Sequence, residues 1–231
     1  MKIAYITGGS KGIGLGVAQY LLNDGYKVAI SGRSTEALNE AEKRLNSENV
    51  LAIQSDVKNQ EDEEAAIKQI VDKWGQLDVV IANAGIGHFK TIEELSTKEW
   101  NDVIDTNLTG VFHTTKASLP HLKKSKGYLI TIASLAGTNF FKQGSAYNAS
   151  KFGLVGFTQA VMLDVRHHGI KVSTIMPGSV STYFNDHTPS ESDAWKIQPE
   201  DIGQMVVDLL HMNPRTLPSK IEVRPSLPPQ K

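Results

Sequence analysis

The fold is set by the stretch KIAYITGGSKGIG, residues 2–14. Its first part, Lys2–Thr7, is a short apolar run without alternation, which is typical of a parallel strand covered by helices on both faces. Three glycines, Gly8, Gly12 and Gly14, stand where this strand turns into a helix expected at Gly12–Asn23. Glycines at such a turn let the backbone approach a pyrophosphate at the helix N-terminus. The stretch therefore predicts a dinucleotide site, although its spacing differs from Gly-x-Gly-x-x-Gly.

The alternation of strand and helix continues to the end of the chain. Six more strands are predicted, at Lys27–Ser31, Val50–Gln54, Leu77–Ala82, Tyr128–Ile132, Lys171–Met176 and Ile221–Arg224. The other helices are expected at about Thr35–Asn46, Gln60–Trp74, Thr97–Lys124, Ala146–His168 and Pro199–Met212. This order predicts a single α/β domain over residues 1–231, with a doubly wound, Rossmann-type, seven-stranded parallel sheet and helices on both faces.

Composition narrows the class of protein. The chain has 231 residues and a net charge of −1, so nothing in its charge favours binding to nucleic acid or to an acidic membrane surface. It has no cysteines, which excludes disulfides and thiolate chemistry. No His, Asp and Glu residues have metal-site spacing, and no apolar run reaches the length of a membrane span. We expect a cytoplasmic protein with no metal, nucleic-acid or membrane partner.

The end of the second strand indicates which dinucleotide is bound. An NAD enzyme usually carries a carboxylate there for the ribose 2′-hydroxyl. This chain has Ser31-Gly32-Arg33-Ser34 instead, with no acid and a guanidinium that matches a phosphate group. Lys11 in the glycine turn adds a second cation. The sequence therefore favours NADP (NADPH) over NAD.

Candidate catalytic residues follow the fifth predicted strand. Ser134 follows the apolar run at Tyr128–Ile132, and Tyr147 and Lys151 open the next helix. Residues four apart on a helix share one face, so Lys151 is expected to place its ammonium beside the Tyr147 phenol. A nearby cation lowers a phenol pKa, which suits general acid–base catalysis. Ser134 is expected to bond the same substrate oxygen.

Taken in order, these motifs resemble the compact form of the short-chain dehydrogenase/reductase (SDR) family. The resemblance covers nearly the whole chain, including the thirteen-residue step from Ser134 to Tyr147. Further family motifs are matched by Asp56-Val57, Asn83-Ala84-Gly85, Asn107 and Pro177-Gly178-x-Val180-x-Thr182.

The resemblance also implies roles for these residues. Ser134, Tyr147, Lys151 and Asn107 would be catalytic, with Asn107 holding a water that links Lys151 to solvent. The cofactor would be held by Tyr147 and Lys151 together with Gly8, Ser10, Lys11, Gly12, Ile13, Gly14, Arg33, Asp56, Val57, Asn83, Ala84, Gly85, Pro177, Gly178, Val180 and Thr182. Among these, Asp56 and Val57 would bind the adenine, and Pro177–Thr182 would fix the nicotinamide amide.

The sequence departs from the family pattern at three places. Ser173 stands where most members have asparagine, and Tyr183 follows Thr182 where an acidic residue is common. The chain closes with a proline-bearing tail after Ile221–Pro225, in place of a glycine-rich end that helps to build tetramers in relatives. We expect a homodimer or a homotetramer, and the departure leaves that choice open.

The regular pattern is interrupted by an insertion at Ser179–Gln198, which we expect to be a mobile loop. The substrate site is expected beneath a lid at about residues 182–198, within this insertion. Its aromatic residues suggest a partly apolar substrate. The loop Ile86-Gly87-His88-Phe89, after the Asn-Ala-Gly motif, is expected near the cleft, with His88 as a candidate substrate contact. One wall is expected from the loop before Tyr147, at Leu135, Ala136, Phe140, Phe141 and Gln143.

The sequence thus predicts an NADP-dependent oxidoreductase acting on CH–OH groups. It would reduce a ketone or aldehyde to an alcohol, or run the reverse reaction, with Tyr147 as proton donor. One alternative is a 3-oxoacyl-[acyl-carrier-protein] reductase, for which Lys123, Lys124 and Lys126 would have to form a basic patch beside the site. Another is a non-catalytic dinucleotide-sensing regulator, although such proteins typically lose the tyrosine or the lysine.

Overall fold

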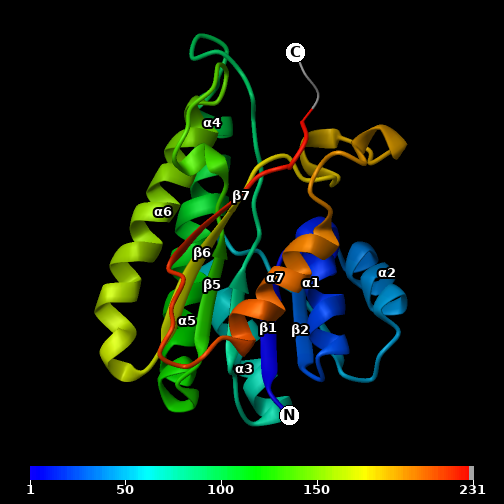
Figure 1. The fold of residues 1–231 in the computed structure, drawn as a ribbon, viewed down its shortest axis with the longest axis vertical. Coiled ribbons are helices and arrows are strands. Elements are labelled where there is room, and N and C mark those ends of the chain that lie inside the picture. The colour runs from blue at the N-terminus through cyan, green and yellow to red at the C-terminus, as the bar shows by residue number, and fades with distance from the viewer. Residues whose placement is uncertain (229–231) are drawn as a thin grey trace.

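The computed structural model describes residues 1–228 and has one seven-stranded sheet, in the order β3-β2-β1-β4-β5-β6-β7 (Figure 1). All neighbouring strands pair in parallel. The strands are β1 (Ile3–Thr7), β2 (Lys27–Gly32), β3 (Val50–Gln54), β4 (Val79–Ala82), β5 (Tyr128–Ile132), β6 (Lys171–Pro177) and β7 (Lys220–Val223). The predicted fold class is confirmed, and each predicted strand is present, with ends that differ by at most two residues.

Helices cover both faces of the sheet, as in a doubly wound fold. On one face lie α1 (Gly12–Asn23), α2 (Thr35–Leu45) and α7 (Pro199–His211), and their apolar residues form one core with the strands. On the other face, α3 (Gln60–Trp74), α5 (Gly110–Ser125) and α6 (Ser145–Val165) contribute to a second core. Successive residues of a strand point to opposite faces. In β1, Ala4 and Ile6 therefore join the first core, while Ile3 and Tyr5 join the second.

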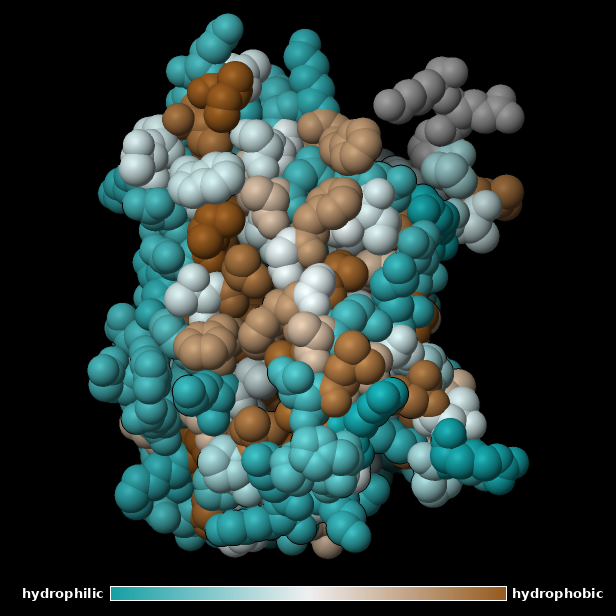
Figure 2. Space-filling model, turned by 90° about the vertical axis from the view of Figure 1, so that its left-hand side faces the viewer, coloured by the Kyte–Doolittle hydropathy of each residue, from teal (hydrophilic) through white to brown (hydrophobic). Residues whose placement is uncertain are grey.

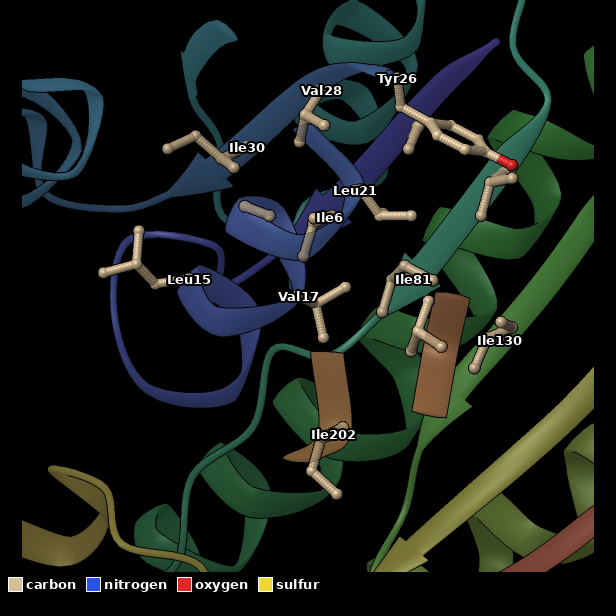
Figure 3. Close-up of a cluster of buried hydrophobic side chains, with 14 of the residues drawn as sticks. Ile6, Leu15, Val17, Leu21, Tyr26, Val28, Ile30, Ile81, Ile130 and Ile202 are labelled. Carbon is tan, nitrogen blue, oxygen red and sulfur yellow. The ribbon is translucent and has the colours of Figure 1, made fainter. Parts of the chain in front are cut away.

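The first core is drawn in Figure 3, where Val17 and Leu21 of α1 lie against Ile6 of β1, and Ile202 of α7 lies beyond Val17. Helices α1 and α7 cross at glycines. A Cβ on Gly203 would lie 2.9 Å from the carbonyl oxygen of Gly16, so the two backbones approach too closely for any side chain at that position. This contact anchors α7 beside the helix that begins at the glycine turn.

One predicted helix is interrupted. The sequence predicted a single helix over Thr97–Lys124, but the chain forms α4 (Thr97–Ile104), a π-helical turn at Asp105–Thr109 and then α5. Asn107 lies inside that turn, and its side chain pairs with the backbone of Ile86, 21 residues away. A wide turn of this kind is frequent at functional sites. None of the helices in the described part of the chain is long and apolar enough to cross a membrane.

Candidate active site

The glycine turn has the shape of an anion site. Gly8 and Gly12 adopt φ values of +64° and +56°, which favour glycine, and a Cβ on Gly14 would lie 2.4 Å from the carbonyl oxygen of Gly8. Helix α1 begins here without a side-chain cap from Lys11 and without an acidic residue in its first turn. Its first N–H groups and its dipole therefore offer a phosphate both hydrogen bonds and positive potential. The cradle fits a dinucleotide pyrophosphate.

Asn83 fixes this turn to the next strand of the sheet. The strand order reverses between β1 and β4, and here the Asn83 side chain donates to the carbonyl oxygens of Thr7 (2.9 Å) and Gly8 (3.1 Å). In return, the hydroxyl of Thr7 accepts from the backbone N–H groups of Asn83 and Ala84. In doubly wound sheets, ligands bind at such a reversal, beyond the carboxyl ends of the strands. The network places the predicted Asn-Ala-Gly motif at that point.

The ends of β2 and β3 carry the residues predicted to bind the adenosine part of the cofactor. Arg33 and Lys11 are exposed, and within residues 1–228 neither takes part in an ion pair. A Cβ on Gly32 would lie 3.4 Å from the Ser10 hydroxyl, so the glycine turn and the end of β2 are adjacent. The Asp56 carboxylate accepts from the backbone N–H of Lys58 and shapes the turn after β3.

Ser134, Tyr147 and Lys151 meet beyond the carboxyl end of β5. Lys151 is buried, its Nζ lies 5.7 Å from the centroid of the Tyr147 ring, and it donates a hydrogen bond to the carbonyl oxygen of Ile132 at 3.0 Å. The Ser134 hydroxyl accepts from the backbone N–H of Ala136 at 3.1 Å. The structure therefore brings together the three residues that the sequence singled out.

Asn148, which the sequence analysis missed, holds this arrangement in place. Its side-chain amide donates to the carbonyl oxygens of Ala136 and Asn139, both at 2.8 Å, and so ties the loop after Ser134 to helix α6. The sequence shows only an asparagine after Tyr147. The structure adds that Asn148 is buried, and a buried amide needs hydrogen-bond partners.

The pKa of Tyr147 contradicts the sequence prediction. Burial raises this pKa to about 12, and a polar interaction with the Ser134 hydroxyl opposes that rise. Burial also lowers the pKa of Lys151 to about 8. The net shift of the phenol pKa is therefore upward, opposite to the direction expected from the nearby cation alone. The low dielectric around both groups disfavours their charged forms more than their proximity favours them.

Asn107 lies next to Lys151, but its side-chain amide makes hydrogen bonds within the protein that stabilise the fold. Its amide accepts from the N–H of Ile86 (2.8 Å) and donates to the carbonyl oxygen of Ile86 (2.9 Å) and to the Ser150 hydroxyl (3.0 Å). A Cβ on Gly85 would lie 3.3 Å from Asn107 Oδ1 and 3.6 Å from Lys151 Nζ. One small region of the site is therefore lined by Gly85, Asn107 and Lys151 together.

The segment after β6 crosses from the catalytic residues to the glycine turn. The carbonyl oxygen of Pro177 lies 3.5 Å from the Ser134 hydroxyl, and the N–H of Gly178 donates to Val223 of β7. At the other end, a Cβ on Gly12 would lie 3.3 Å from the Thr182 methyl group. The predicted nicotinamide segment thus spans the two halves of the site. Val180, within it, pairs with Ile197 in an isolated β-bridge.

Aromatic rings cover Tyr147. The centroid of Phe89 lies 5.4 Å from that of Tyr147, and the centroid of Phe184, within the expected lid, lies 5.7 Å from it. Phe141 is 6.5 Å away. In the loop Ile86–Phe89, which was expected near the cleft, the sequence analysis singled out His88 and not Phe89. It was wrong to place Phe140 in the wall, because that side chain is 84% exposed and stacks on Phe152 of α6.

The lysines required by the carrier-protein alternative lie at the wrong edge of the sheet. Lys123 and Lys124 are in the last turn of α5, and Lys126 follows it, just before the amino end of β5. Ser134 follows the opposite, carboxyl end of the same strand. These lysines therefore do not supply the basic patch beside the site that the carrier-protein alternative requires.

Comparison with known proteins places this site in a family. The family model for short chain dehydrogenases matches residues 2–193, and the chain belongs to that family. An oxidoreductase of Staphylococcus aureus (strain MW2), named only as uncharacterized, is 35% identical over 225 residues, which are 97% of each chain. The resemblance drawn from the motifs is confirmed, and the chain is an oxidoreductase of this family.

Solved structures agree on the fold. The alcohol dehydrogenase of the archaeon Thermococcus sibiricus, complexed with 5-hydroxy-NADP, has a TM-score of 0.92 and 31% identity, and the match covers 100% of both chains. A variant of actinorhodin polyketide ketoreductase with NADPH has a TM-score of 0.88 and 30% identity, over 97% of this chain and 96% of that chain.

Proposed function

We propose that this protein is an NADP-dependent reductase of ketones and aldehydes that also runs in the alcohol-oxidising direction. The observation that carries the proposal is the meeting of Ser134, Tyr147 and Lys151 beyond β5, connected by the segment Pro177–Thr182 to the glycine turn of α1. A dinucleotide bound at the turn would extend toward the phenol along this segment.

The cofactor is assigned to residues at the carboxyl edge of the sheet. The pyrophosphate would lie on the turn Gly8–Gly14, and the adenine would lie near Asp56 and Val57. The nicotinamide would lie between Asn83–Gly85 and Pro177–Thr182. When bound, the nicotinamide supplies the hydride to a carbonyl carbon or accepts it from an alcohol.

Proton transfer to the substrate would be carried out by side chains of the protein. The carbonyl oxygen of the substrate would accept hydrogen bonds from the hydroxyls of Ser134 and Tyr147, and Tyr147 would give its proton to the developing alkoxide. A phenol with a pKa of about 12 stays protonated at neutral pH, so burial keeps Tyr147 ready to donate. The Lys151 ammonium would stabilise the phenolate that remains, and Asn107 would help to return the proton from solvent.

A preference for NADP is supported by charge. Arg33 and Lys11 are exposed on either side of the junction between the glycine turn and β2, and the stretch Ser31–Ser34 contains no carboxylate that would repel a 2′-phosphate. Two similar structures, the Thermococcus alcohol dehydrogenase and the actinorhodin ketoreductase variant, were solved with NADP-type cofactors.

The segment at residues 182–198 is assigned to a lid over the substrate. Phe184 contacts the Tyr147 ring from this segment. An internal cluster holds the lid together. Asp193 is buried, it forms an ion pair with Lys196, and its carboxylate is hydrogen-bonded to His187 Nε2. Its turns are therefore fixed by their own side chains as well as by the ring that reaches the site.

We further propose that the protein is a homo-oligomer, built through the face that α5 and α6 share. Figure 2 shows hydrophobic side chains gathered along the middle of this side of the molecule. Phe112 of α5 and Phe152 and Leu163 of α6 are 42%, 41% and 55% exposed. Covering them would remove apolar surface from water. Analytical ultracentrifugation that reports a monomer at micromolar concentration would refute this assembly.

The direct test is turnover of diacetyl, a small reactive diketone, with NADPH and NADH compared side by side. We expect oxidation of NADPH, and a higher kcat/KM with NADPH than with NADH. Lack of turnover with both cofactors would refute the proposed reaction, and a preference for NADH would refute only the role given to Arg33 and Lys11.

A further inference from the structure

Four aromatic rings form one cluster at the candidate substrate site. Phe89 lies at its centre, with ring centroids at 5.4 Å from Tyr147, 5.7 Å from Phe141 and 6.2 Å from Phe184. The planes of these pairs are inclined by 73°, 61° and 58°. Aromatic rings attract one another in such tilted and edge-to-face arrangements at centroid separations of roughly 4.5–7 Å. The three phenylalanines come from three separate loops and converge on the proposed proton donor.

Gly87 makes this convergence possible. A Cβ at this position would lie 2.8 Å from Cζ of Phe89 and 3.0 Å from Cζ of Phe184. Any side chain here would push at least one of the two rings away from Tyr147. The glycine therefore has a packing role that its loop position alone does not reveal.

The geometry points to a substrate that carries an aromatic ring near its carbonyl group, with that ring bound among Phe89, Phe141 and Phe184. This inference rests on the proposed function, because Tyr147 must reach the carbonyl oxygen. Once the oxygen is at the Tyr147 hydroxyl, the groups attached to the carbonyl carbon lie within reach of these rings. The rings offer faces and edges but no hydrogen-bond donor.

The cluster distinguishes an aromatic substrate from one that is merely apolar. A substrate has to replace some of the contacts between the rings, because the rings pack directly on Tyr147. An aromatic ring restores edge-to-face contacts of the same kind, whereas a saturated ring of the same size restores only dispersion. Each aromatic pair adds about 0.5–1.5 kcal/mol beyond area burial, which corresponds to roughly two- to tenfold in kcat/KM.

The test compares benzylacetone with its cyclohexyl counterpart, in which the phenyl ring is replaced by a saturated ring. Two methylene groups separate the ring from the carbonyl in both ketones, so their intrinsic reactivity toward hydride is alike. Diacetyl, which has no ring, reports the basic reaction. We expect kcat/KM with NADPH to be about fivefold or more higher for benzylacetone than for the cyclohexyl ketone.

Variants test whether the phenylalanine rings cause the difference in kcat/KM between benzylacetone and the cyclohexyl ketone. Phe89→Leu and Phe184→Leu keep an apolar side chain but remove a ring, and each should bring the ratio toward one. Phe140→Leu is the matched control, because that ring stacks on Phe152, away from the cluster, and its loss should leave the ratio unchanged.

The possible failures are distinguishable. Turnover of diacetyl with equal kcat/KM for the two ring ketones overturns the inference and leaves the proposed function standing. Persistence of the ratio in both Phe89→Leu and Phe184→Leu also overturns it. Failure to reduce any of the three ketones with either cofactor overturns the proposed function, and with it this inference.

Discussion

Lys151 and Tyr147 lie one helical turn apart, with Nζ 5.7 Å from the ring centroid, yet the lysine donates its hydrogen bond to the backbone of Ile132. Burial moves the two pKa values in opposite directions, to about 12 for the phenol and about 8 for the amine. At neutral pH the phenol is therefore protonated and the amine is mostly charged. This is the state that a proton donor for a developing alkoxide requires.

The first prediction concerns the pH dependence of reduction. Above a pH of about 8 the Lys151 ammonium loses its proton, and the phenolate formed by proton donation loses its nearby positive charge. We expect kcat/KM for NADPH, which reports the free enzyme, to fall as the pH rises through about 8. Lys151→Met should be far less active, and its profile should lack this limb.

The same pKa makes a prediction about stability. The folded pKa of Lys151 is lowered, so the unfolded chain binds more protons between pH about 8 and the ordinary lysine value of about 10.4. The free energy of unfolding of the wild type, relative to Lys151→Met, should rise with pH across this window. Urea unfolding of both proteins measures the difference, and a difference that falls with pH would contradict the assignment.

Cofactor selectivity should depend on Arg33. A charge-assisted hydrogen bond to the 2′-phosphate is worth about 1.5–3 kcal/mol, so Arg33→Ala should raise the Kd for NADPH by roughly 10- to 100-fold and leave the Kd for NADH nearly unchanged. Arg44→Ala is the charge-matched control, because Arg44 is exposed in the last turn of the neighbouring helix α2. Equal weakening of both cofactors by Arg33→Ala would contradict a contact specific to NADP.

The variant Gly14→Ala tests whether stability and NADPH binding require the close backbone packing of the glycine turn. In Gly14→Ala the new methyl would lie 2.4 Å from the carbonyl oxygen of Gly8, and that backbone atom cannot move freely. We expect a loss of about 1–3 kcal/mol in the free energy of unfolding, together with loss of NADPH binding in a fluorescence titration. Gly156→Ala, in α6, is the control because nothing within the same chain lies within 4 Å of its new Cβ, and it should leave NADPH binding unchanged.

A buried carboxyl beneath the cofactor loops should also shape the pH dependence of stability. Glu63 accepts from Tyr5 (2.9 Å), Ser55 (2.7 Å) and Thr114 (2.7 Å), and burial raises its pKa. An acid whose pKa is raised in the folded chain binds its proton more tightly there than in the unfolded chain. Glu63 should therefore make the folded chain less stable as the pH rises above about 4.3, the pKa of a glutamate in the unfolded chain.

The variant Glu63→Gln tests this sign. The free energy of unfolding of the wild type should decrease, relative to Glu63→Gln, as the pH rises from about 4.3 toward 7. Glu64→Gln, exposed on the same helix, is the charge-matched control. A wild type that gains stability relative to Glu63→Gln over this range would show that the hydrogen bonds to the carboxylate outweigh its burial.

Much of the fold and of the candidate site could be predicted because it depends on local pattern. Short apolar runs mark each strand, and the four-residue step from Tyr147 to Lys151 fixes their shared helix face. Other features could not be predicted, because they depend on contacts between distant parts of the chain. The π-helical turn at Asn107 requires its pairing with Ile86, and Glu63 looks like any helical surface acid until three hydroxyls surround it.

The chemistry of the site could be predicted only in part, for the same reason. The sequence places a cation near Tyr147 but does not reveal how deeply both groups are buried, and burial decides the sign of the pKa shift. Phe89 and Phe184 are single apolar residues in loops, and only the tertiary structure shows that their rings converge with Phe141 on the tyrosine.

The most direct test of the central claim is single-turnover reduction of diacetyl by Tyr147→Phe with bound NADPH. The substitution keeps the ring in its aromatic cluster and removes only the hydroxyl. The proposal predicts a rate lower by roughly 10²–10⁴-fold, the usual contribution of a general acid, with the Kd for NADPH within about twofold of the wild type. A rate within tenfold of the wild type would contradict the role of Tyr147 as proton donor.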